Sequence, residues 1–381
     1  MNGGRAPKAA GGPSLSMDAT QGRKLENMLT DIFADRYKDQ PIWSKFGDAE
    51  RRLLRQIYNL IKEVYPYWRD GKENAPNVAK YKELHDQLAN ELGRKELAPR
   101  YYSYTQKNAF GTDMPVSGWY SYEHVFEQFL TGPFNDSWDP DAYIKARISL
   151  VELVMRKRGT EIAAINYLLS SEIQDASINA ARAKGHGLRL PGDPTEGVIA
   201  RNKAVNDAFS AKVEELNERF RRAGAPLNYH NGFIQFATDQ IVERQISKPF
   251  WTLVSDPKWS NVDIDMKEAL DQRDSNGKDP AIYAAKALES TIKIISAEKG
   301  WTRGTERGAA QYIDNLMKKD HGFLDVWEGE MLKDYFTKVR NAVGHGPGDQ
   351  PMPTLTLPQT DWAIETAMSW IRTMVRRLKS S

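Results

Sequence analysis

Apolar residues recur at helical spacing through most of this 381-residue chain, and this periodicity favours a mainly α-helical fold. The clearest patterns cover residues 53–64, 78–92, 122–130, 141–183 and 196–223. Gly159 is an expected break in the fourth pattern. The core residues expected on that pattern are Ile148, Val151, Leu153, Val154, Ile162, Ile165, Leu168 and Leu169. A helical chain of this length can bury a sizeable core and is expected to divide into two or three domains.

Asn231-Gly232 stands between two short β-prone runs, which is a strong signal for a β-hairpin. Little other sheet is expected. The region between residues 65 and 140 is rich in aromatic side chains, including Tyr101, Tyr102, Tyr104, Trp119, Tyr120 and Tyr122. Such side chains stack on bases in some nucleic-acid-binding proteins. More often they pack beneath irregular loops, and that interpretation is favoured here.

Composition excludes several kinds of site. The chain has no cysteine, so it holds no disulfide, thiolate zinc site or cysteine nucleophile. Its histidines lack metal-ligand spacing, and no glycine-rich nucleotide fingerprint is present. Because the net charge is only +2, any contact with nucleic acid must be local. No apolar run reaches the roughly 18 residues of a membrane span, so we expect a cytoplasmic protein with no membrane partner and no cofactor.

The domain organisation follows from these patterns. Residues 1–20 carry almost no large apolar side chains and are expected to form a disordered tail. Residues 21–245 are expected to form a mostly helical sensing or regulatory domain that contains the small hairpin. Asp136, Asp139 and Asp141 lie within it and indicate an N-capped helix rather than a calcium loop. Residues 246–381 are expected to form a second helical domain.

Four helical patterns follow one another in the C-terminal part. The first has Asp279 as its expected N-cap and Pro280 at its first helical position. Its buried stripe is expected to be Ala281, Ala284, Ala285, Leu288, Ile292 and Ile295, with Glu289 beside it. The others run from Thr305 or Glu306 to Lys319, from Leu324 to Val343 and from Thr360 to Leu378. Such helices pack well as a four-helix bundle.

An arginine and a histidine lie close together where the third of these helices is expected to end. Arg340 lies in the expected last turn, and Gly344 can let the chain leave the helix through a left-handed conformation that brings His345 back toward it. Imidazole moves protons near neutral pH, and guanidinium stabilises the charge on a phosphorane. The pair is therefore a candidate RNA-cleaving site. The alternative is an arginine that stabilises the helix dipole, followed by an ordinary Gly-His-Gly loop.

The run Arg340-Asn341-x-x-x-His345 at a helix end, followed by glycine, resembles the signature of HEPN domains. The segment 279–293 is similar to a helix of HEPN domains in abortive-infection proteins of the AbiJ type. Segments 29–37 and 227–234 resemble the N-terminal halves of those proteins. By this resemblance the C-terminal domain is a HEPN-type four-helix bundle.

The resemblance implies a metal-independent endoribonuclease that leaves a cyclic phosphate and acts in antiphage defence or as a toxin. Arg340 and His345 match the motif, Asn341 matches its polar second position, and Glu289 matches an acidic residue that often faces it. Implied partners are an RNA substrate, a second copy in a homodimer, and a phage-derived trigger or an antitoxin. Basic residues expected to contact RNA are Lys338, Arg372, Arg376 and Arg377.

Two other functions remain open from the sequence. A HEPN domain without catalysis would serve as an RNA-binding, dimerisation or adaptor module. A nucleotide-binding regulator would use Arg340 to hold a small phosphate ligand.

Overall fold

The computed structural model describes residues 31–186, 192–237, 242–275, 277–341 and 355–380 of the chain. Helices make up most of these residues, which confirms the mainly α-helical fold class. Two separate clusters of buried apolar side chains exist, one built from residues between Ile32 and Ile234 and the other from residues between Phe250 and Leu378. The expected tail at residues 1–20 lies outside the described residues.

The N-terminal cluster lies among five helices, one strand pair and the C-terminal end of a sixth helix, α7 (Pro194–Arg222), which contributes Leu216 and Phe220. The helices are α2 (Phe33–Arg36), α3 (Asp48–Val64), α4 (Ala75–Glu91), α5 (Tyr122–Thr131) and the first part of α6 (Pro140–Gly185). The apolar stripe of α3 is buried against the cluster, as its spacing predicts. At its N-terminus, the backbone N–H of Gly47 donates to Glu50 Oε2 at 2.7 Å. The predicted helices around residues 78–92 and 122–130 are confirmed as α4 and α5.

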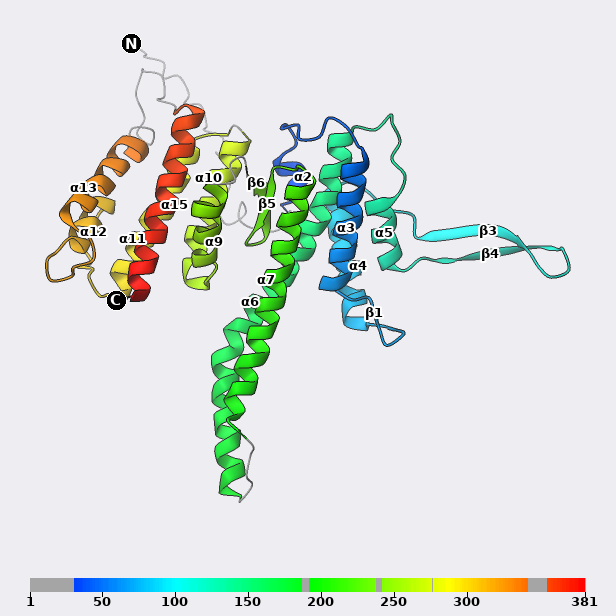
Figure 1. The fold of residues 1–381 in the computed structure, drawn as a ribbon, viewed down its shortest axis with the longest axis horizontal. Coiled ribbons are helices and arrows are strands. Elements are labelled where there is room, and N and C mark those ends of the chain that lie inside the picture. The colour runs from blue at the N-terminus through cyan, green and yellow to red at the C-terminus, as the bar shows by residue number, and fades with distance from the viewer. Residues whose placement is uncertain (1–30, 187–191, 238–241, 276, 342–354, 381) are drawn as a thin grey trace, which may run out of the picture.

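The long helix α6 packs antiparallel to α7 (Pro194–Arg222), and the pair extends from the body as an arm (Figure 1). Asp139 caps α6 by accepting from the backbone N–H groups of Asp141 and Ala142, which confirms the capped-helix interpretation. The break expected at Gly159 is wrong, because α6 continues through it. A Cβ at this position would lie 3.6 Å from the Phe209 ring of α7, an ordinary contact distance, so the packing of the two helices does not require a glycine here.

Three expected core residues of α6 lie beyond the body and are not buried. Ile165 is 37% exposed, Leu168 is 51% exposed, and Leu169 is half-buried. This part of the prediction is wrong because the distal half of α6 has only α7 beside it. Three asparagines hold the two helices together there, and Asn202 and Asn206 of α7 both donate to Asn166 Oδ1 of α6, at 2.8 and 2.9 Å.

The described residues contain three antiparallel hairpins. The predicted one pairs β5 (Leu227–His230) with β6 (Phe233–Phe236). Its turn residues Asn231 and Gly232 both have positive φ, as a tight two-residue turn requires. Little other sheet is present, as expected: β1 (Trp68–Arg69) pairs with β2 (Lys72–Glu73), and β3 (Tyr101–Lys107) pairs with β4 (Asp113–Trp119), two short hairpins that the sequence did not indicate. Asp70 and Gly71 between β1 and β2 also have positive φ.

The C-terminal cluster is built around α11 (Pro280–Glu298), whose predicted buried stripe is confirmed in full. α11 packs against α10 (Ser260–Asp274), α12 (Ala309–Leu316) and α15 (Leu357–Ser380). The remaining elements are the π-helix η1 (Glu243–Ser247), α9 (Lys248–Val254), the 3₁₀ turn η2 (Pro257–Trp259), α13 (Val326–Tyr335) and the π-helix η3 (Phe336–Asn341). α12 is shorter than predicted.

The start of α11 differs from its predicted form. Asp279 occupies the N-cap position, but its backbone has a left-handed conformation with φ of 53° and its side chain accepts no capping hydrogen bond. Its carbonyl instead accepts from the N–H of Ile282 at 2.9 Å. Pro280 still begins the helix, because the first helical position needs no N–H donor.

Candidate functional site

Arg340 lies in η3, the short π-helix that follows α13 without a break. The residues of this segment were predicted to continue an α-helix to Val343, which lies outside the described residues together with Gly344 and His345. π-helical turns widen a helix by one residue and occur often at functional sites. The wider turn follows α13 directly and includes Arg340, the first residue of the predicted motif.

The structure brings Arg340 and Glu289 together, as the resemblance implied. Arg340 Nη1 lies 2.9 Å from Glu289 Oε2, and Lys293 Nζ lies 2.8 Å from the other oxygen, Glu289 Oε1. The side chain of Glu289 is 10% exposed, whereas that of Arg340 is 36% exposed. The carboxylate is therefore held beneath two cations whose outer sides face solvent.

A cleft of about 250 Å³ opens beside this ion pair. It is lined by Asp265, Lys286, Glu289, Ser290, Lys293 and Arg340. Burial raises the pKa of Asp265, and the nearby Lys286 opposes that rise. With three cationic and two acidic side chains, the cleft offers more positive than negative groups to an anionic ligand. A guanidinium can hold two phosphate oxygens at once, and the lysines can neutralise the remaining charge.

The other residues predicted for the site have separate surroundings. Nothing is described of His345 or of the Asn341 side chain. Arg377 donates to both carboxylate oxygens of Glu328, at 2.6 and 2.8 Å, and Arg372 donates to the carbonyl of Gln245. Arg376 is exposed, and Lys338 is 76% exposed with Asp334 3.9 Å away. None of these four basic residues lines the cleft.

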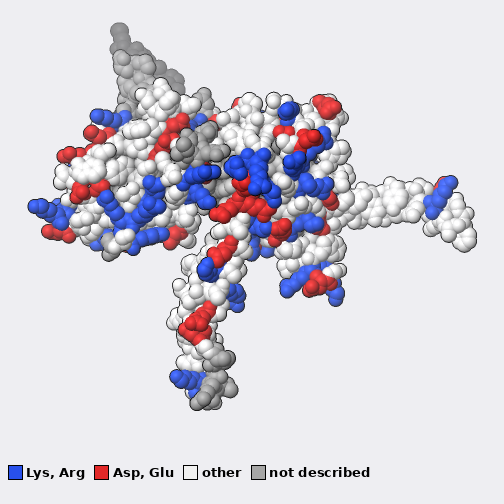
Figure 2. All heavy atoms as spheres, viewed as in Figure 1, with Lys and Arg blue, Asp and Glu red and all other residues white. Residues whose placement is uncertain are grey.

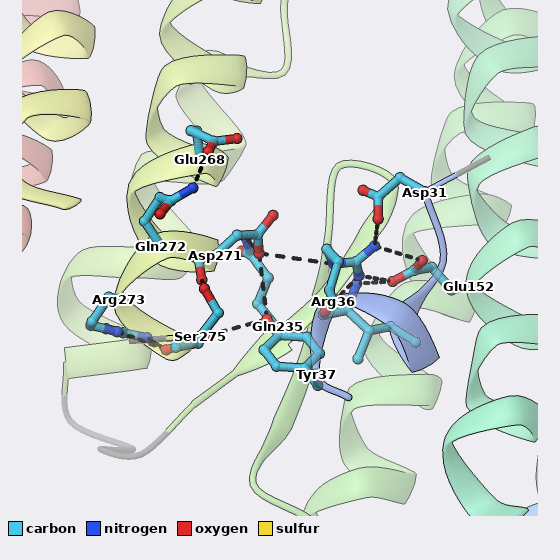
Figure 3. A network of polar contacts seen from close by, with 12 residues as sticks. Asp31, Arg36, Tyr37, Glu152, Gln235, Glu268, Asp271, Gln272, Arg273 and Ser275 are labelled. Carbon is cyan, nitrogen blue, oxygen red and sulfur yellow. Dashed lines mark hydrogen bonds and ion pairs between the residues drawn. The ribbon is translucent and has the colours of Figure 1, made fainter. Parts of the chain in front are cut away.

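A network of buried charges lies between the two apolar clusters, and sequence reasoning missed it (Figure 3). Arg36 of α2 donates to Glu152 of α6 at 2.5 Å and to Asp31 at 2.9 Å. Its Nε lies 3.9 Å from Asp271 of α10. The neighbouring Tyr37 hydroxyl lies 3.2 Å from Asp274 of the same helix. Residues far apart in the chain thus meet between the N- and C-terminal parts.

Burial sets the protonation of this network. It raises the pKa of Asp271 to about 7, although the charge of Arg36 opposes the rise. It also raises the pKa of Asp274, which Arg273 lowers through an ion pair of 2.7 Å. For Arg36, burial disfavours the charged form, but the adjacent carboxylates, Glu152 first, outweigh it and raise the pKa. Arg36 therefore stays charged while Asp271 titrates near neutral pH.

A groove of about 1260 Å³ lies between the base of the α6–α7 arm, the β5–β6 hairpin and α9. His230 lies in it, 2.9 Å from Glu243 and stacked on Trp251 with ring centroids 5.8 Å apart. Asn231 at the turn donates to the Trp251 carbonyl and to Asp263. These contacts fasten the hairpin to the C-terminal part of the chain.

The described residues contain neither a metal-binding cluster nor a membrane-spanning helix. No group of three or more histidine, aspartate or glutamate side chains there is arranged to hold a metal ion. None of the helices described is both long and apolar enough to cross a membrane.

Comparison with known proteins identifies the N-terminal part. The family model described as AbiJ N-terminal domain 4 matches residues 31–252, which is more than half of the chain. These residues include α2 to α7, all three hairpins and most of α9. No curated protein and no solved structure matches the chain. The chain therefore belongs to the AbiJ N-terminal domain 4 family, within the AbiJ type of abortive-infection proteins.

Proposed function

We propose that this chain is a metal-independent endoribonuclease of the HEPN type that acts in abortive-infection defence or as a toxin. Membership of the AbiJ family supports the defence role. Arg340 and His345 form the catalytic pair, and Asn341 and Glu289 hold them in position. The observation that carries the proposal is the cleft in which the Arg340 guanidinium lies beside Lys286, Lys293 and Glu289.

The arrangement of helices supports a HEPN-type bundle. α10, α11 and α15 enclose one apolar core together with α12 and α13, and α11 contacts η3, which carries Arg340. The cleft lies on the outside of this core, where a nucleotide can enter. In the proposed homodimer, two such clefts face each other across a two-fold axis and act on one RNA strand.

The proposed reaction needs two groups. His345 takes the proton from a ribose 2′-hydroxyl, whose oxygen attacks the adjacent phosphorus. The bond to the 5′-oxygen of the next nucleotide breaks, and that oxygen gains a proton. The products are a 2′,3′-cyclic phosphate and a 5′-hydroxyl end. Arg340 stabilises the extra negative charge on the phosphorane, which removes the need for a metal ion.

Before RNA binds, Glu289 occupies the guanidinium of Arg340. Its carboxylate already neutralises Arg340, so a phosphate must compete for the guanidinium before it can bind. The same ion pair favours a second function, a HEPN module without catalysis that serves as an RNA-binding, dimerisation or adaptor protein. The two functions differ in one measurable respect, namely whether RNA is cut.

The experiment compares wild type, His345→Ala, Arg340→Ala and Arg303→Ala in cells under phage challenge, with RNA ends mapped by sequencing that captures cyclic phosphates. Arg303 is an exposed arginine of the C-terminal part that does not line the cleft, so it controls for loss of a charge. In cells with His345→Ala or Arg340→Ala, the number of new RNA ends should be about 100-fold lower than with wild type, or lower still. A wild type that yields no new ends refutes the nuclease and favours the adaptor.

A purified-protein assay separates catalysis from folding. Wild type and the three variants are incubated with total RNA in EDTA, and circular dichroism checks that each is folded. Cleavage by wild type and Arg303→Ala, but not by the other two, supports a metal-independent reaction that needs both groups. Cleavage that survives in His345→Ala contradicts the assigned proton transfer.

A further inference from the structure

The β3–β4 hairpin projects far from the rest of the molecule (Figure 1). It is a two-stranded sheet, and no third strand pairs with it in the described ranges. Seven residue pairs run from Tyr101–Trp119 at its base to Lys107–Asp113 near its tip. An isolated two-stranded hairpin is marginally stable in water, and a third strand or a packed face is usually needed. The hairpin therefore lacks the partner that its architecture calls for.

One face of the hairpin is apolar except at Gln106, which pairs with Met114. Side chains alternate along a strand, so Tyr102 and Tyr104 of β3 share a face with Met114 and Val116 of β4. Tyr104 is 54% exposed and Met114 is 51% exposed. The Tyr102 ring crosses to the other strand at Gly118, where a Cβ would lie only 2.5 Å from its hydroxyl. The opposite face is polar except at its base.

The two edges of the hairpin differ. Backbone bonds run from Tyr120 N to the Arg100 carbonyl at 2.8 Å and from Asn108 N to the Thr112 carbonyl at 3.0 Å, so the even-numbered residues of β3 bond inward to β4. The odd-numbered residues point their N–H and C=O groups outward. Pro115, opposite Thr105, is one of the outward positions on β4 and has no N–H. The outer edge of β4 therefore lacks one hydrogen-bond donor. The outer edge of β3 has an N–H and a C=O group at every outward position, so a further strand can pair with it.

The small number of charged side chains on the hairpin indicates what kind of partner it binds. Its shaft is white in Figure 2, with charged side chains only near the tip, and Lys107 is the one charged residue of β3. RNA would require a row of cations, which β3 lacks. A neutral strand is the matching partner. An antiparallel copy of β3 fits best, because it places the two Lys107 side chains at opposite ends instead of side by side.

We infer that β3 pairs with β3 of a second copy of this chain, in antiparallel register centred on Tyr104. In this register Lys107 lies opposite the partner's Tyr101, where an ammonium can rest on an aromatic ring. Ser103 lies opposite the partner's Thr105, and the two Tyr104 side chains meet at the two-fold axis. The product is a four-stranded sheet with one face that is apolar except at the Gln106 of each copy. This contact is independent of the ribonuclease proposal and lies outside the C-terminal bundle.

Cysteine cross-linking tests the register, because the chain has no cysteine of its own. At the axis, the Cα atoms of the two residues 104 would lie about 4.5 Å apart in a pair of this kind, which a disulfide can bridge. Tyr104→Cys should give a disulfide-linked dimer under mild oxidation. Met114→Cys is the matched control, equally exposed on the same face of β4, but about 20 Å from its counterpart, which lies three strand spacings across the sheet and four residues along it. Its cross-linking should be at least tenfold slower.

Proline substitution tests the edge. Thr105→Pro removes an outward N–H from β3 and thus two hydrogen bonds from the dimer, so the dissociation constant should rise by roughly 10- to 100-fold. Ser117→Pro makes the same change on the outer edge of β4 and should leave dimerisation unchanged. Sedimentation of the full chain measures both. Equal cross-linking at positions 104 and 114, a monomeric wild type, or equal effects of the two prolines overturns the inference.

Discussion

The charge network between the two apolar clusters predicts a large loss of stability on replacing Arg36 with methionine. The Arg36 side chain is 9% exposed and that of its partner Glu152 is fully buried. Methionine keeps much of the apolar stem but removes the guanidinium. Glu152 then keeps Arg156 at 2.7 Å and the N–H of Ile234 at 2.8 Å, whereas Asp271 loses its closest cation.

The size of the effect follows from these contacts. Removing one partner of a buried ion pair costs about 3–5 kcal/mol, and the partners that Glu152 keeps place the expected loss near 3 kcal/mol. Arg55→Met is the control, because Arg55 and Glu127 form an ion pair of 2.7 Å on the surface with side chains 51% and 34% exposed. Removing such a pair costs about 1 kcal/mol or less.

Urea unfolding followed by tryptophan fluorescence measures both variants. The readout covers both clusters, because Trp43 lies in the N-terminal one and Trp251 and Trp259 lie in the C-terminal one. The Arg36→Met midpoint should fall well below that of Arg55→Met. Equal midpoints for the two variants would show that burial adds nothing to the Arg36 contacts and would refute the reasoning.

Three further variants test other parts of the structure. Because burial raises the pKa of Asp271 to about 7, the folded state binds this proton more tightly than the unfolded state, whose aspartate titrates near pH 4. Wild type should therefore lose stability relative to Asp271→Asn as the pH rises from about 4 to 7, and a pH-independent difference in urea unfolding would contradict this. Gly159→Ala should raise stability by about 0.5–1 kcal/mol in thermal melting, since the added methyl would meet Phe209 at an ordinary contact distance of 3.6 Å; a lower melting temperature would show that the helices leave no room. Arg377→Met should cost about 2 kcal/mol in the same assay, because it leaves Glu328, whose side chain is 5% exposed, without its two-pronged partner; no change would assign Arg377 a surface role.

Helical periodicity predicted the positions of α3, α4 and α5 because each has one apolar face against a core. The same pattern in the distal part of α6 led to a wrong prediction of burial. An apolar stripe shows which side of a helix faces a neighbour, but not whether that neighbour is a whole domain or a single helix. Ile165 and Leu168 carry the right spacing but lie on the arm. The asparagine contacts that hold this arm join two helices, and apolar periodicity does not predict such contacts.

Turn chemistry predicted one hairpin of three. Asn231-Gly232 was a clear signal, and Asp70-Gly71 is of the same kind but joins strands of only two residues. The β3–β4 loop from Asn108 to Thr112 is longer than a two-residue turn. The run of tyrosines was therefore interpreted as loop packing, although Tyr101, Tyr104 and Trp119 are more than half exposed.

Part of the candidate site could be anticipated from the sequence and part could not. The resemblance paired Glu289 with the motif, and the structure places its carboxylate 2.9 Å from Arg340. Lys286 and Lys293 share a face of α11 with Glu289, but only the fold shows that this face borders a cleft. The network around Arg36 joins side chains from three distant segments, and no local pattern marks such a meeting.

The seam between the two apolar clusters is made chiefly of ionised and amide groups, and this determines what separating the halves would entail. Parting them would hydrate Arg36, Asp271 and Asp274 and would also break the hydrogen bonds of Asn231 to Trp251 and Asp263. Separation of the halves would therefore release the proton that burial holds on Asp271 near neutral pH, because an exposed aspartate has a lower pKa.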